Sequence, residues 1–189
     1  MADIEEIEEI LFELVSLLDR EGIPYAVMGG LAIRVYSLPR ATQDVDITIA
    51  IERERLDGLR DALHDLGCSL PSAYDSGWLD LVAGMPLFKV KRRIDSHSVD
   101  VDIFVAESRF QKSLIERRHL FEVSGKQIAL VSPEDLLLLK LIAARRRDLV
   151  DIQDLLFIMG TLDESYLRGW AAELGVAERL ERALKQARE

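Results

Sequence analysis

The stretch MGGLAIRVYSLPRATQDVDITIA, residues 28–50, combines a glycine pair with two aspartates that are two positions apart. Its last part alternates as a β-strand does, which places Asp44 and Asp46 on one face and Val45 and Ile47 on the other. Two carboxylates on one strand face, about 7 Å apart, repel each other and are costly to bury without a partner. The pair therefore predicts a cation at this face of a sheet.

Magnesium fits this prediction, because it prefers oxygen ligands and usually takes one or two carboxylates together with substrate phosphates. A third carboxylate from a neighbouring strand would complete a site for two ions. The segment HSVDVDIFVA, residues 97–106, reads as such a strand and carries Asp100 and Asp102. These two share a face, so spacing alone leaves both open. We expect Asp44, Asp46 and either Asp102 or Asp100 to hold two Mg²⁺ ions, with Mn²⁺ as a substitute.

The glycines indicate a phosphate. Gly29 and Gly30 follow the short apolar strand YAVM, and without side chains their backbone N–H groups can approach an anion closely. A helix beginning at LAIRVY would add the attraction of its N-terminal dipole. An anion cradle followed by a cation site suits a nucleoside triphosphate bound with magnesium.

The remaining pattern predicts an α+β fold, a mixed sheet with flanking helices followed by a helical bundle. Helical spacing of apolar residues marks 4–18, 56–66 and a segment around Phe110. Strands are expected at 85–92 and 97–106, and a hairpin at 120–131 turns about its single glycine. From Ser132 the chain reads as helical: one helix through LLLLKLIAARRR, then DIQDLLFIM, 163–174 and 176–187. We divide it into a catalytic core with its N-terminal helix at 1–131 and a helical subdomain at 132–189.

Composition limits the function classes. The 189 residues have a net charge of −10, which argues against a broad, non-specific nucleic-acid binder but leaves room for a local basic groove such as KVKRR at 89–93. The sequence contains neither a Walker phosphate-binding motif nor histidines at metal-ligand spacing. No apolar run has the length of a membrane span, and the single Cys68 is expected to be a buried, inert thiol in a cytoplasmic protein without a membrane partner.

The ordered combination of strand, Gly29-Gly30, thirteen residues and Asp44-Val45-Asp46-Ile47 resembles the nucleotidyltransferase superfamily with the DNA polymerase β-like fold. The sequence around this motif is similar to that of the minimal prokaryotic branch that includes AbiEii-type toxins. Residues matching that branch lie in two groups: Pro39, Arg40, Thr42, Asp44 and Asp46, then Glu134, Asp135, Leu136, Lys140, Arg145, Asp148 and Asp151. The resemblance covers about Tyr25 to Leu156. It departs from many relatives at Tyr36-Ser37, where they carry a glycine after the tyrosine.

The resemblance implies roles for these residues. Asp44 and Asp46 would hold the metal ions, with Asp102 favoured as the third carboxylate because VDIFVA matches the family pattern, and Gly29 and Gly30 would hold the triphosphate. Phosphate contacts are implied for Lys140 and Arg145, and a loop-shaping or cofactor-binding role for Thr42 or Arg40. Structural alternatives remain open: Lys140 as a lysine extending from an apolar helix, Arg145 in an ion pair with Asp148, and Thr42 and Arg40 as loop residues only.

The expected activity is magnesium-dependent transfer of a nucleoside monophosphate from a nucleoside triphosphate to a hydroxyl of a tRNA or other RNA end, a protein or a small molecule. The resemblance adds a role in a toxin–antitoxin pair with a cognate antitoxin. Two alternatives stand beside it: a catalytically inactive module of the same fold that regulates a protein partner, and a plain RNA-binding protein, which the acidity disfavours.

Overall fold

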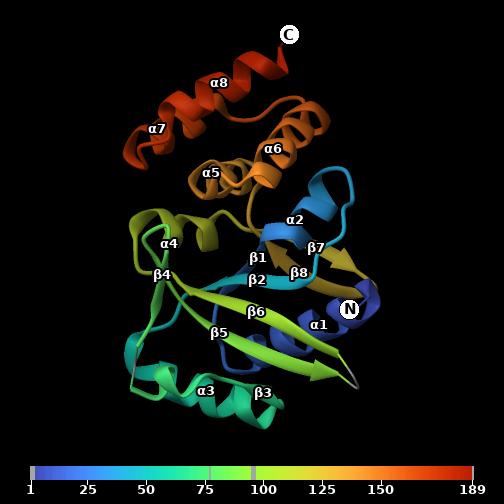
Figure 1. Ribbon diagram of the computed structural model, residues 1–189, viewed down its shortest axis with the longest axis vertical. Coiled ribbons are helices and arrows are strands. Elements are labelled where there is room, and N and C mark those ends of the chain that lie inside the picture. The colour runs from blue at the N-terminus through green and yellow to red at the C-terminus, as the bar shows by residue number, and fades with distance from the viewer. Residues whose placement is uncertain (1–2, 77, 95–96, 189) are drawn as a thin grey trace.

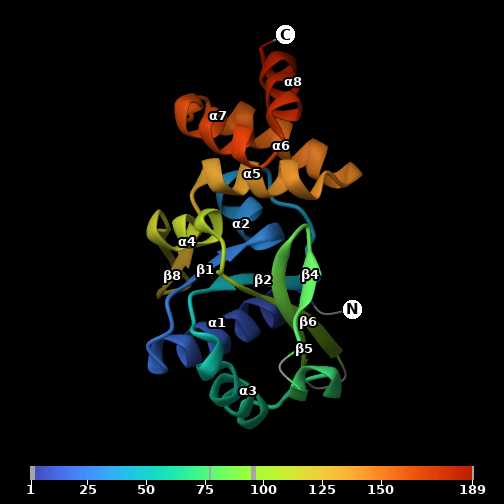
Figure 2. The same ribbon diagram turned by 90° about the vertical axis from the view of Figure 1, so that its left-hand side faces the viewer.

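The computed structural model describes residues 3–76, 78–94 and 97–188 and confirms the predicted mixed α/β fold. A central mixed sheet lies between helices α5–α8 at one end of the molecule and helix α3 at the other (Figures 1 and 2). The helices are α1 (Ile4–Arg20), α2 (Gly29–Tyr36), α3 (Leu56–Asp65), α4 (Arg109–Glu116), α5 (Pro133–Ala143), α6 (Arg146–Met159), α7 (Glu164–Glu173) and α8 (Ala177–Ala187). Short 3₁₀ turns, η1 (Arg53–Arg55) and η2 (Ser72–Ser76), complete the helical elements of the described residues.

The sheet has the strand order β3-β5-β6-β2-β1-β8-β7, with β4 paired to β5, within the residues that the structure describes. Its strands are β1 (Tyr25–Met28), β2 (Asp44–Ile49), β3 (Cys68–Ser69), β4 (Asp80–Val82), β5 (Met85–Ile94), β6 (His97–Val105), β7 (His119–Val123) and β8 (Lys126–Leu130). The central pair β2 and β6 is parallel, whereas β5 pairs antiparallel with β6 and β1 antiparallel with β2. This arrangement places β2, β6 and β5 side by side, so that the aspartates of β2 and β6 lie next to the lysines of β5.

Local sequence signals explain where the main elements begin. The Asp3 side chain accepts a hydrogen bond from the Glu6 N–H, and Glu6 returns one from the Asp3 N–H, which caps α1. Ser132, from which the chain is predicted to be helical, caps α5: its hydroxyl accepts from the N–H of Asp135 at 3.1 Å. The predicted hairpin is present as β7 and β8, and its turn places Ser124 and Gly125 at positive φ, as tight hairpin turns require.

Two expectations about the elements were wrong. The helix predicted through LLLLKLIAARRR ends at Ala143, because Ala144 adopts a left-handed conformation (φ 50°, ψ 32°) and α6 begins afresh at Arg146. The Pro-, Ser- and Gly-rich segment 67–77, whose composition predicts a loop, contains the short strand β3 and the turn η2 in its described part. Short elements of this kind carry too few residues for a period to be visible.

One hydrophobic cluster joins the sheet to the helices on both sides. Leu136, Leu137 and Leu138 of α5 are fully buried in the same cluster as Val45 and Ile47 of β2. Cys68 is buried as predicted, and burial raises the pKa of its thiol to about 11. In the part of the chain that the structure describes, no helix combines the length and apolar character needed to cross a membrane.

Candidate active site

The four predicted aspartates lie in two matched rows across β2 and β6. Asp44 is in register with Asp100, and Asp46 with Asp102. Because both strands are parallel and share one face at these positions, the carboxylates of each row lie side by side. The structure thus places the four aspartates of β2 and β6 on one face of the sheet.

The neighbouring strand β5 adds a lysine to each row. Lys89 donates hydrogen bonds to both carboxylate oxygens of Asp102, at 2.8 and 2.7 Å, and Lys91 forms an ion pair with Asp100 at 2.7 Å. The Asp102 side chain is 22% exposed and that of Asp100 63% exposed. Asp102 is therefore the more enclosed of the two candidates for the third carboxylate, and it lies in the row of Asp46.

Among the four aspartates, Asp46 is the one whose ionised form is clearly disfavoured by its surroundings. Its partial burial raises the pKa of the carboxyl to about 7, and the neighbouring carboxylates of Asp44 and Asp102 add to the rise, against the opposing charges of Lys140 and Arg145. A carboxyl that is only half ionised near neutral pH lacks a positive partner. A cation at this point would stabilise the ionised form of Asp46.

Gly29 provides the space that Asp46 occupies. It begins α2 at φ +66°, and a Cβ on this residue would lie 1.9 Å from Oδ2 of Asp46. Any side chain would collide with the carboxylate, so the glycine serves the acid directly. The predicted helix after the glycine pair is present and starts at Gly29 itself.

Gly30 provides the space that the Thr42 side chain occupies, as Gly29 does for Asp46. A Cβ on Gly30 would lie 2.4 Å from Oγ1 of Thr42, whose side chain is buried against this glycine. The Thr42 hydroxyl donates to Oδ1 of Asp44 at 2.9 Å. Thr42, expected to shape the loop or bind the cofactor, thus contacts one of the acids.

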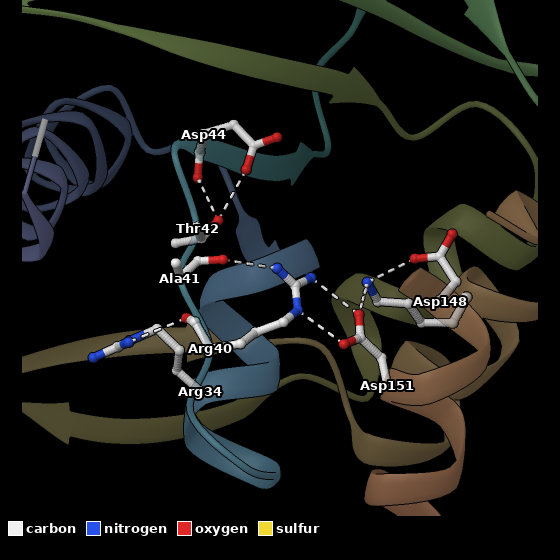
Figure 3. Close-up of polar contacts among 8 residues, drawn as sticks. Arg34, Arg40, Ala41, Thr42, Asp44, Asp148 and Asp151 are labelled. Atoms are coloured by element: carbon white, nitrogen blue, oxygen red, sulfur yellow. Dashed lines mark hydrogen bonds and ion pairs between the residues drawn. The ribbon is translucent and has the colours of Figure 1, made fainter. Parts of the chain in front are cut away.

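Lys140 lies in a buried ion-pair cluster that the sequence did not reveal. Its Nζ donates to Oδ1 of Asp148 at 2.9 Å and to Oδ2 of Asp151 at 2.6 Å, and Arg40 binds Asp151 through Nε at 2.8 Å and Nη2 at 3.0 Å (Figure 3). Burial alone would raise the pKa of Asp151, but the hydrogen bonds and charges of Arg40 and Lys140 outweigh it and lower the pKa. Lys140, Asp148 and Asp151 belong to one motif of the family resemblance and are close in sequence. The contact between Arg40 and Asp151, which are 111 positions apart, had no sequence signal.

Arg145 lies at the entrance to the site. Its side chain is exposed and, with Lys140, Gly29 and Asp46, lines a cavity of about 70 Å³ between the sheet and α5. For the alternative of an Arg145–Asp148 ion pair, the structure shows a hydrogen bond from the Arg145 backbone N–H to Oδ2 of Asp148, at 2.9 Å. Arg145 thus lines the same cavity as Asp46.

A second hollow adjoins the acids on the β5 side. It has a volume of about 620 Å³ and is lined by Gln43, Asp44, Ser69, Leu70, Pro71, Lys89, Lys91, Asp100 and Asp102. Its size falls within the range of small-molecule sites. The acids thus separate two hollows, one with Gly29 and Arg145 and one with the two lysines.

The donor set has the chemistry of a magnesium site but is not arranged as one. Among residues 3–76, 78–94 and 97–188, no group of three histidine, cysteine or acidic side chains lies close enough to hold an ion. The ammonium group of Lys89 pairs with the Asp102 carboxylate, where a metal ion would otherwise supply the positive charge. The all-oxygen donors and the raised pKa of Asp46 fit a hard divalent cation, provided that Asp102 turns away from Lys89.

The fold is shared with solved structures of low sequence identity. A nucleotidyltransferase-like antigen from Paracoccidioides brasiliensis is 22% identical, covers 96% of this chain and 93% of its own, and has a TM-score of 0.56. The lincosamide antibiotic adenylyltransferase LnuA, with lincomycin bound, is 17% identical, covers 80% and 97%, and has a TM-score of 0.54. The antibiotic-resistance factor ANT(2″)-Ia, in a solution structure, is 15% identical, covers 95% and 92%, and has a TM-score of 0.55. At these identities the similarity establishes the fold.

The sequence comparisons establish the family. No curated protein sequence matches the chain. A family model described as "Uncharacterised nucleotidyltransferase" matches residues 4–189, almost the entire chain. The chain is therefore an enzyme that belongs to this nucleotidyltransferase family.

Proposed function

We propose that this nucleotidyltransferase transfers a nucleoside monophosphate from a nucleoside triphosphate to a hydroxyl acceptor, with Asp44, Asp46 and Asp102 holding two Mg²⁺ ions. The observation that carries the proposal is the row formed by Asp46 and Asp102, in which the pKa of Asp46 is raised to about 7 between two hollows. Bound magnesium would neutralise the phosphates and the charge that develops during transfer. Asp102 is preferred to Asp100 because it is less exposed and lies in register with Asp46.

The residues of the smaller cavity would bind the triphosphate. Gly29 and Gly30 present the first N–H groups of α2, whose dipole favours an anion. Arg145 would contact the phosphates with its exposed guanidinium. Lys140 would contribute its positive charge from behind, because its Nζ already donates to two carboxylates.

The acceptor would enter from the larger hollow on the β5 side. Its hydroxyl oxygen would attack the α-phosphorus and release its proton to solvent, while the bond from the α-phosphorus to the β-phosphate oxygen breaks and pyrophosphate leaves. Binding the triphosphate and the acceptor in neighbouring hollows would bring the hydroxyl close to the α-phosphate. A volume of about 620 Å³ is adequate for a small molecule or for the end of a longer chain such as an RNA or a protein loop.

The similarity of residues 39–46 and 134–151 to the AbiEii-like branch supports a toxin–antitoxin role for this enzyme. A cognate antitoxin would then be a protein partner. The proposed compartment is the cytoplasm, which suits a buried, unpaired Cys68.

The regulatory-module alternative is favoured by one observation, the pairing of Lys89 with Asp102. If that pair is permanent, Asp102 cannot bind a metal ion. Replacing Lys89 by Gln frees Asp102 without adding a charge, so an enzyme should bind Mn²⁺ more tightly in Lys89→Gln, while Lys91→Gln should have little effect.

The proposed function is tested with α-labelled nucleoside triphosphates and magnesium added to RNA, protein extract and a small-molecule pool. Label should enter one pool with the wild type and fall by at least about 100-fold in Asp46→Asn. Asp61→Asn, on the exposed face of α3, is the matched control and should behave as the wild type. Labelling that persists in Asp46→Asn would refute the assignment of the acids, and no labelling from any nucleotide would favour the regulatory module.

A further inference from the structure

The ion-pair cluster of α5 and α6 is enclosed and electrically balanced. Lys140 is 7% exposed, and Asp148 and Asp151 are each 3% exposed. With Arg40, whose side chain is 23% exposed, the cluster contains two positive and two negative groups. Because its charges are paired and enclosed, the cluster can hold together the segments that carry them.

The cluster holds the loop that leads into β2. Arg40 belongs to this loop, residues 37–43, and uses both edges of its guanidinium: Nε and Nη2 bind Asp151, and Nη1 donates to the backbone oxygen of Ala41 at 3.1 Å (Figure 3). Arg34 of α2 also donates to the backbone oxygen of Arg40, at 3.2 Å. The loop has no regular secondary structure, and these contacts tie it to α2 and α6.

The same loop orients one of the acids. Thr42 follows Ala41 directly, is buried against Gly30, and donates its hydroxyl to Oδ1 of Asp44 at 2.9 Å. Asp44 itself is exposed, and within the described residues Thr42 is the group whose hydrogen bond orients its carboxylate. A continuous set of contacts therefore runs from Asp151 on α6 to Asp44 on the sheet.

We propose that Arg40 and Asp151 are positioning residues that hold Thr42, and through it Asp44, in the orientation that the active site requires. The inference rests on the proposed function, in which Asp44 is a metal ligand. It assigns α6 a part in the geometry of a site formed on β2. Asp151 acts through Arg40 and touches no substrate.

The first test examines the metal-free protein. Three-bond couplings measured by NMR report the χ1 angle of Asp44, which should adopt one rotamer in the wild type. Arg40→Lys keeps the charge but loses the two-pronged contact with Asp151 and the bond to Ala41, so Asp44 should show averaging between rotamers. Thr42→Val should show the same averaging, and Thr42→Ser, which retains the hydroxyl, should restore the single rotamer.

The second readout is the affinity for Mn²⁺, measured calorimetrically. Loss of a group that supports a metal ligand typically weakens binding about 10- to 100-fold, and we expect about 10-fold for both Arg40→Lys and Thr42→Val. The double variant should bind no more weakly than either single variant, because both changes interrupt the same set of contacts. Arg168→Lys, which alters an exposed ion pair between α7 and α8, should bind as the wild type.

Three outcomes would overturn the inference: a single Asp44 rotamer in Arg40→Lys, wild-type Mn²⁺ affinity in that variant with only its thermal midpoint lowered, or additive losses in the double variant. Asp151→Asn should reproduce Arg40→Lys, and the lysine variant decides the question if the asparagine variant fails to fold. Rotamer averaging in Arg40→Lys supports the coupling even when no nucleotide transfer is found. The absence of transfer then counts against the proposed function alone.

Discussion

Asp46 carries a charge that the fold disfavours, and this has a measurable effect on stability. In an unfolded chain an aspartate ionises near pH 4, whereas burial and the neighbouring carboxylates raise the pKa of Asp46 to about 7 in the folded protein. Between these values the folded state binds a proton that the unfolded state has lost. The free energy of unfolding contributed by Asp46 therefore falls as pH rises from about 4 to about 7, and the full loss remains above pH 7.

Asp46→Asn removes this titration. Without metal, the variant should exceed the wild type in unfolding free energy by about 1–3 kcal/mol at pH 8, less than the full shift because the site retains some contact with water. The difference should vanish near pH 4. Urea denaturation at pH 4.5 and pH 8 measures it, and an equal difference at both pH values would show that Asp46 ionises normally.

Gly29 offers a second prediction at the scale of one residue. Gly29→Ala adds a Cβ that would lie 1.9 Å from Oδ2 of Asp46, on a residue at φ +66°. Left-handed strain and the collision together should cost about 2–4 kcal/mol of unfolding free energy. In Gly58→Ala, the control on α3, the new Cβ meets no atom within 4 Å and should stabilise the helix by about 0.5–1 kcal/mol. Comparable midpoints for both variants in thermal denaturation would contradict the close packing of Gly29 and Asp46.

At the scale of elements, periodicity was sufficient for the long helices and strands. The alternation in DVDITI predicted β2 and placed its acids on one face, and the capping signal at Ser132 marked the start of α5. The break after Ala143 escaped prediction because alanine favours helix continuation, whereas Ala144 adopts a left-handed conformation in the structure. Strand β4 has only three residues, too few for alternation to be recognised.

In the candidate site, features set within one strand could be predicted from the sequence, and features set by contacts between elements could not. The acids of β2 and β6 were predictable because each pair alternates within its own strand. Their exact pairing, Asp46 with Asp102, depends on the register between two strands, which a single sequence does not reveal. The basic segment 89–93 was visible in the sequence, but the pairing of Lys89 with Asp102 and of Lys91 with Asp100 depends on the register between β5 and β6. The contact between Arg40 and Asp151 likewise depends on tertiary packing.

For the whole molecule, the boundary proposed near residue 131 divides elements that share one hydrophobic cluster. The buried leucines of α5 belong to the same cluster as the core of β2, and α2 packs against both α5 and α6. We therefore expect one cooperative unfolding transition, with a calorimetric enthalpy equal to the van't Hoff enthalpy. Two separate transitions by scanning calorimetry would show that the helical segment is an independent folding unit.

The long span between Arg40 and Asp151 has a consequence for synthesis. A chain emerging from the ribosome exposes β2 and its acids early, but the partner of Arg40 follows 111 positions later. If domains form largely as units during translation, Asp44 acquires its final orientation only after α6 has left the exit tunnel. A nascent chain would thus carry the acids for most of its elongation without a completed site, and activity would begin only once α6 has folded onto the loop.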